Sequence, residues 1–258
     1  MSLRLSGRRA PRGTDGAALR KWAMVFLSMG IVGRCILQNA MLGMNSATNG
    51  ELLALLDTAG AMPVLTAALV CQVMETCATP LFAFMLVEGF LRTSSFEKYL
   101  LRVGAVALIA ELPYNLAMNG SLLSLGTRNP AFGMVIALVM LFFFNRYGEK
   151  SLKNVMMKAL IFAAAFLWCV MLSIDHGTFV IIFTLLLWAV REKSNVRALF
   201  AFCAAMICTM FNMYYIGACL SCIFLHGYNE ERGEQNRIFN YAFYPAILLI
   251  LGIGAKFI

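Results

Sequence analysis

Two carboxylates lie inside apolar stretches of this chain. They are Glu88 and Glu111. An ionised side chain at the centre of a membrane helix costs at least about 2.5–3.5 kcal/mol, so a chain that keeps two of them is expected to use them. Helical rise places Glu88 roughly 6 Å from Arg92 and Glu111 roughly 20 Å from Lys98. The two carboxylates therefore lie at different depths, which excludes an acid–base pair of the glycosidase kind.

Arg34 is a third charged residue within an apolar stretch. Helical rise places it roughly 20 Å beyond Lys21, which matches the depth of Glu111. Neither side chain tolerates hydrocarbon alone, so we predict that Arg34 and Glu111 meet, directly or through Gln38. Such a pair can serve chemistry, or it can fix helix packing alone.

A short turn, Ile174-Asp175-His176-Gly177, interrupts two apolar segments. An aspartate beside a histidine can orient the imidazole for general base catalysis. We expect Asn115 and Asn129 at the same end of the bundle. The alternative interpretation is a hydrated turn between two helices.

The segment 226–233 is the other concentration of polar residues. Arg232 and backbone N–H groups near Tyr228 and Asn229 could bind an anion, or the segment could be a solvated loop. Just before it, Cys219, Cys222 and His226 share one helix face. Zinc usually takes more ligands than these three residues supply, so we predict no metal site.

Composition identifies the elements that must position these groups. The chain has 258 residues, of which 61% are hydrophobic and only 13% charged, and its mean hydropathy is +0.77. These values exclude an ordinary soluble domain. They predict an all-α, polytopic transmembrane bundle, because helices satisfy their backbone hydrogen bonds internally. The net charge of +8 does not indicate nucleic acid, because the basic residues flank apolar segments, where membrane topology explains them.

The apolar segments predict about nine to ten membrane segments in a single domain over 22–258, after a basic cytoplasmic tail over 1–21. The positive-inside rule places the N-terminus in the cytoplasm. We expect a loop and an interfacial helix over 44–61, and a helix break at Thr79-Pro80. The expected spans are 22–43, 62–91, 98–118, 130–146, 155–173, 177–190, 197–211, 212–227 and 238–257.

Several motifs together resemble the TraX family of bacterial membrane proteins, which is named for the conjugation protein that N-acetylates F pilin. The resemblance covers most of the chain from Arg34 onward. Family members often carry an Asp-His pair where this chain has Gly30-Ile31, and a histidine where it has Ile247. The motifs are Phe82–Leu91, Lys98–Arg102, Glu111–Tyr114, Asp175–Gly177, Tyr228-Asn229, Arg232-Gly233 and Phe243–Pro245.

The resemblance implies an acyltransferase of the bacterial cytoplasmic (inner) membrane with acetyl-CoA as donor. The acceptor would be an amine or hydroxyl of an exported peptide or glycan. The donor would bind near Tyr228, Asn229, Arg232 and Glu88, and its acyl group would reach Arg34, Glu111 and His176, the base oriented by Asp175. Two alternatives stay open: a catalytically inactive scaffold or accessory protein, and a small-solute transporter that uses the buried charges as its path.

Overall fold

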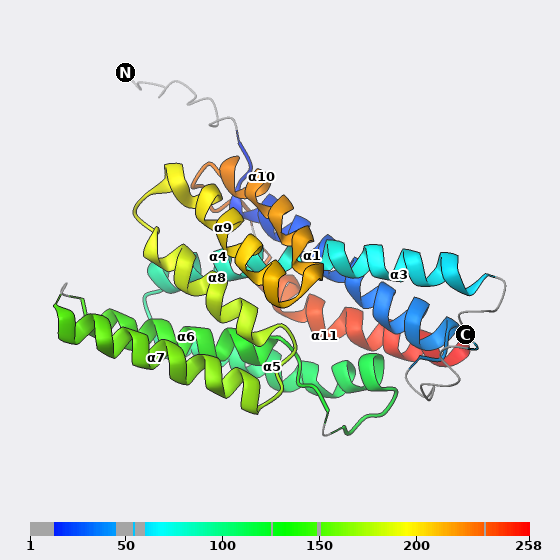
Figure 1. Ribbon diagram of the computed structural model, residues 1–258. Coiled ribbons are helices and arrows are strands. Elements are labelled where there is room, and N and C mark those ends of the chain that lie inside the picture. The colour runs from blue at the N-terminus through cyan, green and yellow to red at the C-terminus, as the bar shows by residue number, and fades with distance from the viewer. Residues whose placement is uncertain (1–12, 45–53, 55–59, 125, 149–150, 235) are drawn as a thin grey trace, which may run out of the picture.

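The computed structural model describes residues 13–44, 54, 60–124, 126–148, 151–234 and 236–258 (Figure 1). Within these residues the fold is all-α, as predicted, with two isolated backbone bridges. The main helices are α1 (Gly16–Ile31), the π-helix η1 (Val32–Met41), α3 (Ala61–Glu75), α4 (Ala78–Arg92), α5 (Phe96–Asn119), α6 (Ala131–Arg146), α7 (Leu152–Met171), α8 (Gly177–Ala189), α9 (Arg197–Phe211), the 3-10 segment η3 (Met213–Leu220), α10 (Ser221–His226) and α11 (Arg237–Gly254).

Six of the described helical segments are long and apolar enough to cross a membrane, and three more are apolar but shorter. Together they correspond to the predicted spans, so this is a multi-pass membrane protein. α1 begins earlier than expected because the Asp15 side chain caps it, accepting a hydrogen bond from the Ala18 N–H at 2.7 Å. Arg20 therefore belongs to the helix rather than to the predicted tail. The predicted interfacial helix over 44–61 lies largely outside the described residues.

The helices form one bundle in which distant segments pack side by side (Figure 1). α5 packs along α11, α4 along α8, and α1 along α3. Small side chains line several interfaces; Ala78 and Ala83 of α4, and Ala204 of α9, are buried. Small residues allow membrane helices to approach closely, because lipid provides little hydrophobic drive for helix association.

A predicted break between α3 and α4 positions one part of the site. The helix is interrupted at Thr76-Cys77, three residues before the expected position, and Pro80 lies in the first turn of α4. Proline is tolerated in a first turn because its missing N–H would have no helical partner there. The Thr76 hydroxyl donates to the Tyr214 carbonyl at 3.0 Å. This contact joins the break to η3, the segment that carries Tyr215.

Candidate functional site

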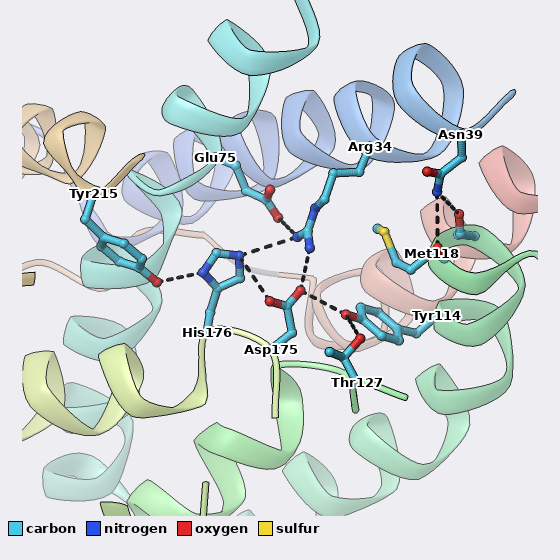
Figure 2. Close-up of polar contacts among 10 residues, drawn as sticks. Arg34, Asn39, Glu75, Tyr114, Met118, Thr127, Asp175, His176 and Tyr215 are labelled. Carbon is cyan, nitrogen blue, oxygen red and sulfur yellow. Dashed lines mark hydrogen bonds and ion pairs between the residues drawn. The ribbon is translucent and has the colours of Figure 1, made fainter. Parts of the chain in front are cut away.

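Arg34 is the centre of a network of charged and polar side chains from segments far apart in the sequence (Figure 2). Its guanidinium binds Asp175 at 2.6 Å and Glu75 at 2.9 Å. The same guanidinium lies 3.4 Å from Nε2 of His176. Thus the half-buried cation has two anionic partners, as the cost of an unpaired charge requires.

Glu111 has different partners. Its carboxylate accepts hydrogen bonds from Arg128 at 3.0 Å and from the Asn129 side chain at 2.6 Å. Asn129 is fully buried and also donates to the Ala107 carbonyl at 2.9 Å. The prediction that Arg34 pairs with Glu111 is therefore wrong. The two have similar depths, but Glu75 and Asp175 are the acids that contact Arg34.

Asp175 lies in the turn between α7 and α8, outside both helices. Backbone bonds fix this turn: Arg128 N–H donates to Ser173 at 3.0 Å, and Asp175 N–H donates to Arg128 at 2.9 Å. The Tyr114 hydroxyl donates to Asp175 Oδ2 at 2.9 Å. Burial alone would raise the pKa of Asp175, but the Arg34 guanidinium and the hydrogen bond from Tyr114 hold that pKa well below its usual range. Asp175 is therefore a carboxylate that stabilises Arg34.

His176 is held mainly by Tyr215. Its Nδ1 lies 2.7 Å from the Tyr215 hydroxyl, whereas Asp175 Oδ1 lies 3.6 Å from Nε2. Since a guanidinium can only donate, Nε2 is the acceptor in its contact with Arg34, which assigns the proton to Nδ1. Tyr215 is fully buried and stacks on Phe179 at 3.9 Å between ring centroids. The neutral ring therefore carries its lone pair on Nε2.

The backbone at His176 is also unusual. Its φ angle is 55°, in the left-handed region that a residue with a side chain seldom adopts. Such strain persists only where surrounding contacts impose it, and it is common at functional sites. Here the bridge between Arg128 and the turn, together with the Tyr215 contact, imposes it.

Glu75 is an acidic site residue that sequence reasoning missed. It ends α3 and is 6% exposed. Its side chain occupies the space beside Gly30, where an added Cβ would collide with the carboxyl group. The criterion that selected Glu88 and Glu111, a carboxylate in an apolar run, would also have selected Glu75. The contact between Glu75 and Gly30 could not be predicted, because no sequence pattern links these two positions.

A cavity of about 690 Å³ leads to this network. At one end, which we call the basic end, its wall carries Arg20, Arg92, Arg102 and Arg232. At the other, the histidine end, it carries Glu75 and His176. The wall between them is mostly apolar and includes Leu27, Phe82, Met85, Val106 and Met134. The rise of α4 from Ala78 to Arg92 is about 21 Å, so the cavity extends through much of the bundle.

The predicted donor-site residues divide between this cavity and its surroundings. Glu88, Tyr228 and Arg232 line it, and Glu88 pairs with Arg92 at 2.6 Å. Asn229 instead lines a separate pocket of about 310 Å³, beside His226. Burial raises the pKa of the Tyr228 phenol, with a further contribution from Glu88. Glu111 belongs to the wall of neither cavity.

A buried arginine supports the loop that carries Tyr228. Arg197 is 4% exposed, and its guanidinium lies 4.8 Å from the Phe84 ring centroid and 5.3 Å from that of Tyr228. Cation–π contacts of this kind hold an aromatic ring in place. Within the described part of the chain, no group of three ligating side chains is arranged to hold a metal ion, and this includes Cys219, Cys222 and His226.

Comparison with known proteins identifies the family of the chain. The family model described as "TraX protein" matches residues 18–254. The chain belongs to the TraX family. A similar protein is the "Probable fimbrial assembly protein FimC, serogroup H1" of Dichelobacter nodosus, which is 28% identical over 202 residues, covering 69% of this chain and 80% of that protein. No solved structure matches.

Proposed function

We propose that this TraX-family protein is an integral membrane acyltransferase. It would transfer an acetyl group from acetyl-CoA to an amine or hydroxyl of an exported peptide or glycan. The observation that carries the proposal is the single cavity that joins four arginines to His176. This arrangement suits a donor with phosphates at one end and a reactive acyl group at the other.

The residues of the cavity fit such a donor. Glu88 is the acid that lines this end beside the four arginines, and it pairs with Arg92. Guanidinium groups bind phosphate oxygens in paired hydrogen bonds, so this end would hold the nucleotide part of acetyl-CoA. The apolar wall would accommodate the pantetheine arm, and Tyr228 would lie beside that arm. When bound, acetyl-CoA supplies the acyl group as a thioester.

The chemistry of the histidine end fits general base catalysis. The acceptor amine or hydroxyl would displace the 3.4 Å contact between Arg34 and Nε2 of His176, and Nε2 would take its proton as it attacks the thioester carbonyl. Tyr215 would hold the imidazole in the required tautomer. Arg34 would be kept in place by Asp175 and Glu75, and its positive charge would stabilise negative charge that develops nearby. The donor would enter from the cytoplasmic side, if the N-terminus lies there.

The chain contains only two histidines, which gives a matched test. Purified protein in proteoliposomes is supplied with acetyl-CoA and candidate acceptors, and products are identified by mass spectrometry. We expect His176→Ala to abolish acetyl transfer while acetyl-CoA binding, measured by calorimetry, persists. His226→Ala, outside the large cavity, is expected to retain transfer. Full activity of the His176→Ala protein would show that the assigned base is wrong.

A second function is favoured by the fimbrial relative. That relative is named as a fimbrial assembly protein, and by analogy this chain would act as a membrane scaffold or accessory protein for an exported fibre. In that case the purified protein would not bind acetyl-CoA and would co-purify stably with an assembly partner. Binding of acetyl-CoA at the basic end, lost in Arg92→Gln/Arg232→Gln protein, would argue against a scaffold alone.

A further inference from the structure

Tyr244 is a residue of α11 that lines the large cavity. Its ring packs against a cluster that includes Ile31, Tyr114 and Leu248. Tyr244 lines the cavity together with Glu75 and His176. Tyr114, a member of that cluster, donates to Asp175, so Tyr244 packs beside the charged network.

The hydroxyl of Tyr244 is buried and has no hydrogen-bond partner among the described residues. Two other tyrosines at this end are engaged, since Tyr114 donates to Asp175 and Tyr215 contacts His176. Several other buried polar atoms in the described chain also lack a partner, but none of their residues lines this cavity: Arg34 Nε, Gln72 Nε2, Thr184 Oγ1 and Ser221 Oγ.

An unsatisfied buried hydroxyl destabilises a fold, and phenylalanine would fill almost the same volume without that cost. A tyrosine at this position is therefore explained if a ligand supplies the acceptor. A phenol O–H can donate to a carbonyl oxygen, and more strongly to one that carries negative charge.

We infer that Tyr244 is a catalytic residue that donates a hydrogen bond to the carbonyl oxygen of the acyl group in this cavity. The inference rests on the proposed acyl transfer. His176 Nε2 takes the acceptor's proton as the acceptor nitrogen or oxygen bonds to the carbonyl carbon. Tyr244 stabilises the negative charge that forms on the carbonyl oxygen. When the C–S bond breaks, His176 returns the proton to the departing sulfur.

The test removes one oxygen atom. Tyr244→Phe is compared with wild type and with Tyr214→Phe, a matched deletion of a hydroxyl outside the cavity wall. The first measurement needs no acceptor: infrared difference spectra of acetyl-CoA labelled with ¹³C at the acetyl carbonyl, bound to the protein. We expect the carbonyl stretch of bound acetyl-CoA to lie at lower frequency than that of free acetyl-CoA in wild type and in Tyr214→Phe. In Tyr244→Phe this shift should be absent.

The second measurement is acetyl transfer. Loss of one oxyanion donor typically lowers kcat by about 100-fold or more, so we expect about that loss in Tyr244→Phe with little change in KM for acetyl-CoA. Melting temperature in detergent should stay equal or rise, because an unpaired buried hydroxyl has been removed. If Tyr244 had only a structural role, Tyr244→Phe would instead lower the melting temperature.

The outcomes separate the two proposals. If acetyl-CoA binds and reacts but Tyr244→Phe leaves both carbonyl frequency and kcat unchanged, the role of Tyr244 is refuted and acyl transfer stands. If wild type neither binds acetyl-CoA nor shifts its carbonyl stretch, acyl transfer fails, and the role of Tyr244 fails with it.

Discussion

Replacement of Arg34 by methionine is the sharpest test of the charged network. Arg34→Met keeps an apolar side chain of similar length but leaves Glu75 and Asp175 without their cation. Removing one partner of a buried ion pair costs about 3–5 kcal/mol, because the remaining charge is left uncompensated. The side chains of Arg34, Asp175 and Glu75 are 21%, 18% and 8% exposed, so some water reaches them. We therefore expect a loss near the lower limit, about 3 kcal/mol.

The rescue variant makes this prediction specific. In Arg34→Met/Glu75→Gln/Asp175→Asn the acids become neutral groups of similar volume. Replacing a whole buried ion network is often nearly neutral, so the triple variant should recover most of the lost stability. The free energy of unfolding is measured in bicelles by steric trapping, which reports reversible unfolding in a membrane-like medium.

Arg128→Met serves as the matched control. Arg128 and Glu111 form an ion pair in which the side chains are 38% and 15% exposed. Asn129 also donates to Glu111, so that carboxylate keeps a partner when Arg128 is removed, and we expect a smaller loss than for Arg34→Met. Two results would refute the reasoning: a triple variant as unstable as Arg34→Met, or an Arg34→Met protein no less stable than the Arg128→Met control.

Two further predictions concern the surroundings of the same network. Gly30→Ala places a Cβ against Glu75, so we expect a destabilisation of about 1–3 kcal/mol from overpacking, and weaker acetyl transfer. The control, Gly104→Ala, has open space around the added Cβ and should stabilise the helix by about 0.5–1 kcal/mol. Equal melting temperatures for the two variants would contradict the predicted clash with Glu75. Because Asp175 has a lowered pKa when folded, its stabilisation is present above the usual carboxyl pKa, about 3.9, and is lost as the pH falls below it. Melting temperatures should therefore decline below about pH 4 in wild type and less steeply in Asp175→Asn; identical profiles would exclude this contribution.

The helical architecture could be predicted because it depends on local properties of the chain. Apolar runs must become helices in a membrane, and basic residues and proline mark their ends. The break near Pro80 was located to within three residues for that reason. The Asp175-His176 turn stood out because polar residues interrupt two apolar segments.

The sequence by itself determined that Arg34 lies deep in the bundle and must have an acidic partner, since burial of a lone charge is too costly. It could not determine which acid. Helical rise gives depth along an axis, whereas contact also requires the rotation of each helix and the identity of its neighbours. Only the tertiary structure decided that Glu75 and Asp175 meet Arg34, that Tyr215 rather than Asp175 holds the imidazole, and that one cavity joins the basic end to His176.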